Sequence, residues 1–277
     1  MRRVLLAIVV AVPMAGAPAQ AALSVKDVMR RVAAYVDAYG EKAQIVVATE
    51  HYTQDARGSV SAPETRRILA EFAIVRVPRL RGWQGFRDVV EVDGARISDR
   101  DDRLVRILTA SDGGYAEARR LSNESARFNI GALHRNFNVP TTALFFFSAD
   151  NLERFRFAAR GVQPDGTWEI AFRETSRPTL IRTPDGQSVP SEGSIWVNPS
   201  DGTVVRTLLK LGGFAPSGQT KGTAHADVRY RPVTHLGMWL PASMDEQLET
   251  HGMISETISG RAVYSNYRQF TTSGRIK

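Results

Sequence analysis

Side chains that could perform chemistry are sparse in this sequence, and the most suggestive pair is His225 with Asp227. On a β-strand, residues two apart point to the same face, so this imidazole and carboxylate could share a metal ion or a proton. Two ligands fall short of the three or four that a protein zinc site needs. We therefore keep an enzyme built on this pair only as the last of three alternatives, and we expect no metal ion and no cofactor.

Recognised catalytic motifs are also missing from the sequence. It contains no G-x-S-x-G elbow, no H-E-x-x-H pair, no P-loop and no G-x-G-x-x-G. The paired carboxylates Asp101 and Asp102 stand in a charged turn, where solvation explains them. Cysteine is absent, which excludes a disulfide, a thiolate metal site, a cysteine nucleophile and a lipobox cysteine. We predict no catalytic residues, and a fold that is held together by packing alone.

The first 21 residues have the features of a secretory signal peptide. Arg2 and Arg3 precede a short apolar run, and Ala19-Gln20-Ala21 is an A-x-A cleavage site. The run is too short to cross a hydrocarbon layer of about 30 Å as a helix. We therefore expect cleavage after Ala21 and a single mature domain, 22–277. It would be periplasmic or secreted, with peripheral or transient membrane contact only.

The chain is basic, with a formal charge of +7, to which Arg2 and Arg3 contribute two units. Such a net charge most often only keeps the surface solvated. The functional alternative is attraction to anionic lipid headgroups or other polyanions. Export argues against a nucleic-acid partner. Arginines are frequent in the first half of the chain, and the alternation of the sequence is expected to place most of them on a solvated face: Arg76, Arg79, Arg81, Arg87, Arg96, Arg100, Arg103 and Arg106.

Residues 193–211 contain the clearest strand signal. Two β-branched and apolar runs flank Asp201-Gly202, which predicts a hairpin. Similar runs predict a large antiparallel sheet: 43–52, 67–77, 86–92, the residues around Arg96 and Ile97, 103–108, 155–157 paired with 168–172, 179–183, 224–230, 239–249 and 258–271. The polar stretches 53–65 and 212–223 are predicted to be loops, the second of them mobile.

Three stretches have the composition of helices. In 24–39 apolar residues recur at helical spacing, Ser24 and Asp27 resemble a capping box, and Gly40 is expected to end the helix. Such an apolar stripe would pack on a sheet face. Residues 115–130 and 140–147 are the other two predicted helices. The last ends in Leu144-Phe145-Phe146-Phe147, which is either a core plug or part of a lid over a lipid-sized cavity.

Four motifs in the last third of the chain resemble a known family. They are Gly193-Ser-Ile-Trp-Val-Asn-Pro-Ser-Asp-Gly-Thr-Val-Val-Arg206, Ala226-Asp-Val-Arg-Tyr230, Gly237-Met-Trp-Leu-Pro241 and Tyr264-Ser-Asn-Tyr-Arg-Gln-Phe270. With the predicted order of elements, the chain resembles the outer-membrane lipoprotein-sorting, LolA/LolB-like family. The resemblance implies an α+β fold: a large curved antiparallel sheet, or unclosed β-barrel, wrapped around helices. It also implies an apolar cavity that shields acyl chains from water.

The leading hypothesis is therefore an exported carrier that binds a lipid or the acyl chains of a lipoprotein in a sheet cavity. Phe145, Phe146 and Phe147 are the residues expected to line or cover that cavity, and Trp196 and Trp239 are secondary candidates. The second alternative is an interaction module for envelope proteins, whose curved sheet is filled by its own side chains and takes no ligand. A cavity large enough for an acyl chain would separate these two hypotheses.

Overall fold

The protein is organised around one large, open antiparallel sheet. The computed structural model describes residues 23–43, 46–58, 62–77, 82–98, 103–110, 114–131, 135, 138–183, 185–217, 220–252 and 255–269. The signal-peptide prediction, Arg79, Arg81, Arg100 and His134 lie outside these residues. Within them, no helix is long and apolar enough to span a bilayer.

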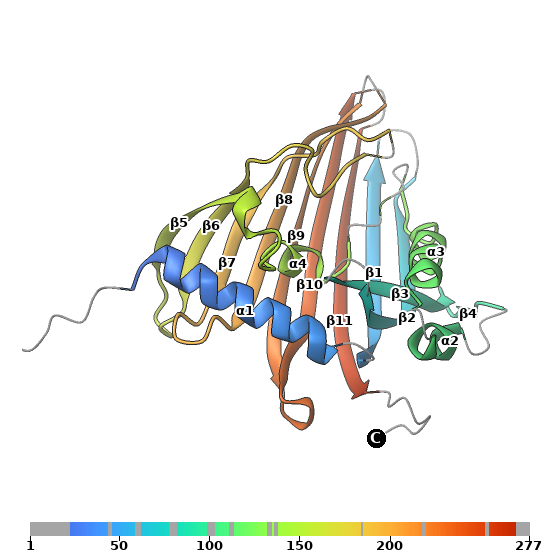
Figure 1. Cartoon of the computed structure of the whole chain (residues 1–277). Helices are drawn as coiled ribbons and strands as arrows, with labels where there is room; N and C mark the ends of the chain where they lie inside the picture. The colour runs from blue at the N-terminus through green and yellow to red at the C-terminus, as the bar shows by residue number, and fades with distance from the viewer. Residues whose placement is uncertain are drawn as a thin grey trace, which may run out of the picture.

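The sheet contains eleven strands in the order β4-β3-β2-β1-β11-β10-β9-β8-β7-β6-β5, so β4 and β5 are its two ends (Figure 1). The strands are β1 (Val46–Gly58), β2 (Glu64–Val77), β3 (Gly82–Val92), β4 (Ala95–Arg96), β5 (Phe155–Val162), β6 (Trp168–Glu174), β7 (Ser191–Val197), β8 (Val204–Ser217), β9 (Thr220–Val233), β10 (Met238–Gly252) and β11 (Glu256–Gln269). The predicted large antiparallel sheet is thus confirmed, including the hairpin around Asp201-Gly202.

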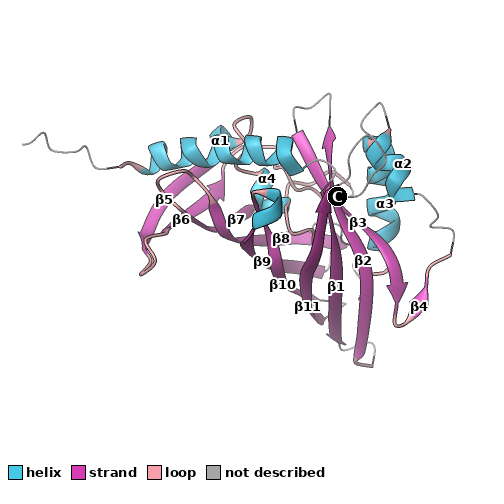
Figure 2. Cartoon of the chain, turned by 90° about the horizontal axis from the view of Figure 1, so that it is seen from below, coloured by secondary structure: helices cyan, strands magenta, loops and turns pink. Residues whose placement is uncertain are grey.

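Helices lie on both sides of this sheet (Figure 2). The helical segments are α1 (Val25–Ala43), α2 (Arg103–Thr109), α3 (Tyr115–Ala126), α4 (Thr142–Phe145), η1 (Leu152–Arg154) and η2 (Thr234–Leu236). Helices α1 and α4 pack against the face that we call the inner face, in the main core. A second core forms on the outer face, where Leu104 of α2 and Leu121 of α3 cover Ala73, Val75 and Phe86.

Both stretches predicted to be loops are largely strand. Strand β1 continues to Gly58, with Gln54 and Ala56 buried between exposed neighbours. Strands β8 and β9 remain paired as far as Ser217 opposite Thr220, so the prediction of a mobile loop over 212–223 is wrong. Polar and glycine-rich composition hid these extensions, because a strand that is solvated on one face needs only every second residue to be buried.

Two predicted strands are not strands. Residues 103–108 belong to helix α2, in which Leu104 and Ile107 are three apart and both buried against the outer face. The apolar residues of this short segment fit the spacing of a helix as well as that of a strand. Packing against the second core on the outer face favours the helix. Residues 179–183 contain only an isolated bridge between Arg182 and Ser188. The predicted helix 140–147 is reduced to the four residues of α4 and the turns beside it.

Helix α1 begins as predicted and ends later than predicted. The Ser24 hydroxyl donates to the Asp27 carboxylate at 2.6 Å and accepts the Asp27 backbone N–H at 3.1 Å, which caps the first turn. Gly40 does not end the helix, which continues to Ala43. A Cβ at Gly40 would lie 1.9 Å from Cδ1 of Trp83, so this glycine makes room for the indole of β3.

Candidate functional site

Near the β5 end of the sheet, the inner face carries a cluster of phenylalanines, which we call the aromatic cluster. It consists of Phe146, Phe147, Phe155, Phe157 and Phe172, and Phe145, which precedes it in the chain, contacts Trp83 instead. Phe147 lies edge-on to Phe172 with ring centroids 5.1 Å apart, and Phe146 stacks on Phe155 at 5.5 Å. These contacts join α4 and the turn after it to the edge strand β5 and its neighbour β6.

The centre of the aromatic cluster is closed to solvent, and Phe157 at its margin is half-buried. Phe147 is fully buried and Phe146 is 2% exposed, whereas Phe145 is half-buried and contacts Trp83 edge-on at 5.9 Å. A side chain with no accessible surface has no water-sized void beside it, so the rings fill this part of the interior. The three phenylalanines singled out from the sequence thus lie on the inner face. Their contact with a ligand remains a prediction.

The two secondary candidates lie in different environments. Trp239 is half-buried and packs against the main core from β10. Trp196 of β7 lies on the outer face, where the guanidinium of Arg206 stacks 4.2 Å above its ring. Trp196 therefore does not face the interior, and alternation along β7 explains why, since its neighbours Ile195 and Val197 are the fully buried residues.

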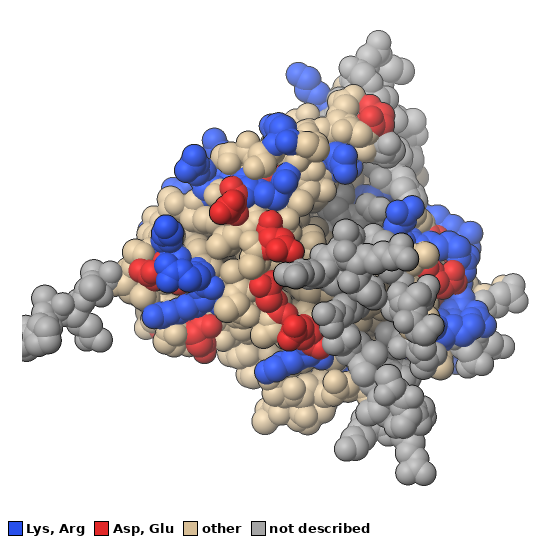
Figure 3. All heavy atoms as spheres, in the orientation of Figure 1, with Lys and Arg blue, Asp and Glu red and all other residues tan. Residues whose placement is uncertain are grey.

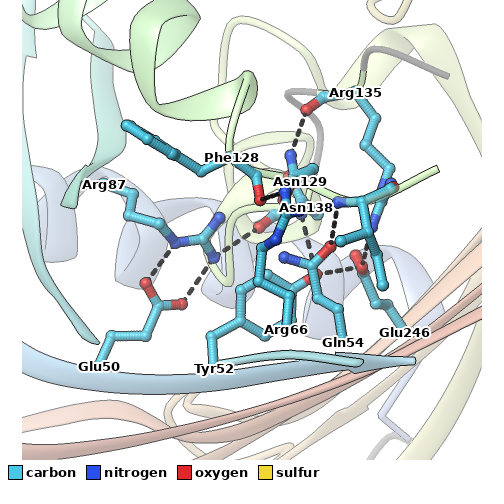
Figure 4. Close-up of polar contacts among 11 residues, drawn as sticks. Glu50, Tyr52, Gln54, Arg66, Arg87, Phe128, Asn129, Arg135, Asn138 and Glu246 are labelled. Carbon is cyan, nitrogen blue, oxygen red and sulfur yellow. Dashed lines mark hydrogen bonds and ion pairs between the residues drawn. The ribbon is translucent and has the colours of Figure 1, made fainter. Parts of the chain in front are cut away.

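Near the opposite end of the sheet, the inner face carries buried ion pairs instead of rings (Figure 4). Arg87 of β3 binds the Glu50 carboxylate of β1 through both Nε and Nη2, the latter at 2.6 Å. The Tyr264 hydroxyl donates to the same carboxylate at 2.7 Å. Glu50 is fully buried and Arg87 is 5% exposed, so this bidentate pair is isolated from water.

A second buried pair continues this arrangement, which we call the polar network. Arg135 donates to the Gln54 side chain at 2.5 Å and to Glu246 at 3.3 Å. The Tyr52 hydroxyl donates to Glu246 and accepts from the Asn138 amide at 3.1 Å. The guanidinium carbon of Arg87 also lies 4.6 Å from the centre of the Tyr52 ring. Tyr52 therefore contacts both ion pairs and connects them.

The polar network holds the chain between α3 and α4 against the inner face. Arg87 Nη2 donates to the Asn138 carbonyl at 3.2 Å, and Arg135 Nη1 donates to the Ile130 carbonyl at 2.6 Å. Close by, the Tyr230 hydroxyl donates to the Pro140 carbonyl at 2.8 Å, just before α4. The position of α4, and with it that of the aromatic cluster, therefore depends on polar contacts that originate in the sheet.

Burial and neighbouring charges shift the ionisation of this network. Burial is the main cause that raises the pKa of Tyr52 and Tyr264, and the carboxylates Glu246 and Glu50 beside them raise it further. Burial alone would lower the pKa of Arg87, but the attraction of Glu50 outweighs it and raises that pKa. Both tyrosines therefore stay neutral donors over the physiological pH range.

Sequence reasoning missed the polar network and misplaced its Arg87, and it also misplaced Arg103 of α2. Arg87 and Arg103 are buried in ion pairs, the latter with Asp88 at 2.9 Å, and are not on a solvated face. The signal that could have revealed the network is a polar residue in an apolar alternation: Glu50 shares the inner face with Ala48 and Tyr52. Arg135 carries no such signal, because it belongs to neither a helix nor a strand.

The His225–Asp227 pair is not arranged for catalysis. Both side chains share one face of β9, as predicted, but Asp227 accepts hydrogen bonds from Nε of Arg206 at 2.8 Å and from its Nη2. Opposite His225 lie Lys210 and Gln247, and neither is a usual metal ligand. The part of the chain that the structure describes contains no group of three or more metal-ligating side chains.

Comparison with known proteins gives structural neighbours only. No family model matches the chain, and no curated protein matches it. A solved structure from Vibrio parahaemolyticus, described as an outer membrane lipoprotein-sorting protein domain, is 13% identical to this chain, with a TM-score of 0.39. The match covers 87% of this chain and 91% of that one. A LolA superfamily protein from Nitrosomonas europaea is 12% identical, with a TM-score of 0.30 and coverages of 86% and 94%.

A third solved structure, a DUF1329 family protein from Desulfovibrio piger, is 12% identical with a TM-score of 0.35, and the match covers 88% of this chain and 92% of that one. The open sheet of this protein, curved around α1 and α4, is the architecture that its four motifs imply. The predicted α+β fold, a large antiparallel sheet that is not closed and packs around helices, is confirmed.

Proposed function

We propose that this exported protein binds a hydrophobic ligand, a lipid or the acyl chains of a lipoprotein, at the aromatic cluster. The single observation that supports the proposal is the composition of that cluster. Five phenylalanine rings, those of Phe146, Phe147, Phe155, Phe157 and Phe172, meet between the turn after a four-residue helix and the edge of an open sheet, and Phe145 lies beside them in the sequence. The rings are held to one another by apolar contacts, which an alkyl chain can replace at little cost.

The energetics of such an exchange are favourable. An acyl chain that leaves water gains about 0.8 kcal/mol for each buried methylene group. To enter, it must displace rings that are now buried, and Phe145 and Phe157 beside them are only half-buried. The segment that must move is short, since α4 spans only Thr142–Phe145, and its movement leaves every strand of the sheet paired.

The experiment is native mass spectrometry of the protein purified from its own periplasm, followed by organic extraction and titration with a fluorescent fatty acid. We expect a co-purifying lipid or lipoprotein and saturable uptake of the probe. Phe145→Ala should weaken uptake, because it removes a ring at the point of entry. Val263→Ala, which removes an exposed apolar side chain from the outer face of β11, is the matched control and should leave uptake unchanged.

A second candidate function has an observation of its own. Four rings of the aromatic cluster, Phe146, Phe147, Phe155 and Phe172, are buried, which fits an interaction module for envelope proteins with a filled core and no ligand. A protein that is empty after purification and takes up no fatty acid would exclude the carrier and favour this module.

A further inference from the structure

The outer face of strands β5 to β8 bears a groove of about 350 Å³. Its geometry follows from the strand register. Arg156 lies opposite Arg173, Arg173 opposite Glu192, and Glu192 opposite Lys210, so these four side chains form one row across four strands. Adjacent strands are about 4.8 Å apart, so the row is roughly 14 Å long.

The next row of the same face is made of small and apolar side chains. Ala158 lies opposite Ala171, Ala171 opposite Ser194, and Ser194 opposite Leu208. Short side chains in this row form the floor of the groove. The long side chains of the charged row form one wall, and Arg160 contributes beyond the floor.

The charges of this groove are not balanced from within. Arg173 is paired with Glu192 at 2.9 Å. Among the residues that the structure describes, no carboxylate lies within ion-pair distance of Arg156, Arg160 or Lys210, and all three are exposed. Like charges directly opposite one another destabilise a sheet, as Arg156 and Arg173 do here. An anion bound between them would remove this repulsion.

Three arginines elsewhere on the outer face are paired with carboxylates, whereas Arg229, directly opposite Arg206, is exposed. Arg206 is paired with Asp227, Arg261 lies 3.5 Å from Asp245, and Arg268 is paired with Glu71. On the opposite side of the molecule, basic and acidic side chains stand next to one another over α1 (Figure 3). The groove is therefore defined by its shape, a row of long charged side chains beside a floor of short ones, and not by exposed positive charge alone.

We propose that this groove binds the phosphate of an anionic phospholipid headgroup, and so docks the outer face of β5–β8 on a bilayer surface. The guanidinium fork matches phosphate oxygens in two parallel hydrogen bonds, and the volume suits a group of headgroup size. A bilayer presents many anionic groups in one plane, so it can meet Arg156, Arg160 and Lys210 together. Docking rests on the outer face alone and does not require the proposed function.

Docking in this way would nevertheless serve a lipid carrier. Strands β5 and β6 carry the charged row on one face, and alternation turns the rings of Phe155, Phe157 and Phe172 toward Phe147 on the other, although Phe157 and Phe172 also border the groove. A bilayer held at the groove would thus lie next to the edge of the sheet at which the aromatic cluster is found.

The test is flotation of the mature protein with phosphatidylcholine vesicles that contain or lack phosphatidylglycerol. We expect binding only to vesicles with phosphatidylglycerol, and binding that weakens as salt is added. The triple variant Arg156→Gln, Arg160→Gln, Lys210→Gln should lose on the order of a hundredfold in partition, because each basic residue near an anionic surface contributes about fivefold. The control variant Arg57→Gln, Arg106→Gln, Arg119→Gln removes the same charge from exposed sites elsewhere and should bind like the wild type.

Several results would overturn the proposal. One is equal loss in both triple variants, which would indicate diffuse net charge, and another is wild-type binding by the groove variant. Preference for an acidic peptide over the vesicles would assign the groove to a protein partner. Tight binding of glycerol phosphate without vesicle binding would assign it to a soluble phosphate. Uptake of fatty acid by the groove variant is measured in parallel and should be unchanged, so failure of docking and failure of the carrier function are distinguishable.

Discussion

The inner face of the sheet has two regions, and they are stabilised in opposite ways. The aromatic cluster, near β5, is held by ring contacts, which depend little on direction. The polar network, near β1 and β3, is held by two buried ion pairs and the tyrosines between them, and each of its bonds requires one geometry. The comparison suggests that one region of the interior can adapt its shape while the other cannot.

The physical reason lies in the cost of leaving each kind of contact. A ring displaced by an alkyl chain exchanges one apolar neighbour for another. A buried carboxylate that loses its guanidinium partner keeps its desolvation penalty and gains nothing in return. The aromatic cluster can therefore open for a ligand, whereas the polar network is suited to keep the chain before α4 in place while it does so.

The largest expected effect is the loss of the folded state at alkaline pH, which tests the polar network. Burial raises the pKa of Tyr52 and Tyr264, so the folded protein keeps protons that the unfolded chain releases above about pH 10. The free energy of unfolding should be unaffected below that pH and fall steadily above it. Circular dichroism and phenolate absorbance should change together in a pH titration.

A matched variant makes this test specific to the polar network. Tyr264→Phe should start to unfold at a higher pH than the wild type, because one buried phenol no longer ionises on unfolding. Phenolate absorbance that rises near pH 10 while the circular dichroism is unchanged would show that these tyrosines are not sequestered.

Removal of one ion-pair partner is the next largest effect. Arg87→Leu should lower the free energy of unfolding by about 3–5 kcal/mol, because it leaves the Glu50 carboxylate buried and uncompensated. The double variant Glu50→Leu, Arg87→Leu should recover much of that loss, and the exposed control Arg106→Gln should change it by less than about 0.5 kcal/mol. Urea denaturation measures all three. If the double variant is no better than Arg87→Leu, the pair contributes specific contacts that apolar packing cannot replace.

The smallest effect is expected in the aromatic cluster. Phe147→Leu should cost about 1.5 kcal/mol in urea denaturation, because neighbouring rings can move into part of the lost volume. It should also leave uptake of a fluorescent fatty acid intact, since leucine still offers an apolar surface. A loss as large as that of Arg87→Leu would mean that the aromatic cluster is as rigid as the polar network, and would remove the difference between the two regions.

Local patterns were sufficient to predict most of the sheet and the start of α1. The 193–211 hairpin, the capping pair Ser24 and Asp27, and the 155–157 strand paired with 168–172 all follow from signals within a few residues of one another. The same reasoning failed for Gly40 and for 103–108. In both cases a distant partner decides, Trp83 for Gly40 and the outer face of the sheet for α2.

The candidate site also contains residues that the sequence indicated and residues that it did not. Phe145, Phe146 and Phe147 are conspicuous in the sequence because they are consecutive and apolar, and the inner-face position of this run is what such composition predicts. Nothing local indicates that Arg135 reaches Glu246, or that Arg87 reaches Glu50, since each pair joins segments far apart in the chain.

The sequence by itself determined a large antiparallel sheet, because alternation and turn residues act over short distances and survive without any knowledge of tertiary neighbours. That the sheet is open was implied by the family resemblance of its motifs. Only the tertiary structure decided which charges are buried in pairs and which are left exposed on the groove of β5–β8. A charged side chain has the same letter in either place, and its role depends on whether the fold brings an opposite charge within reach.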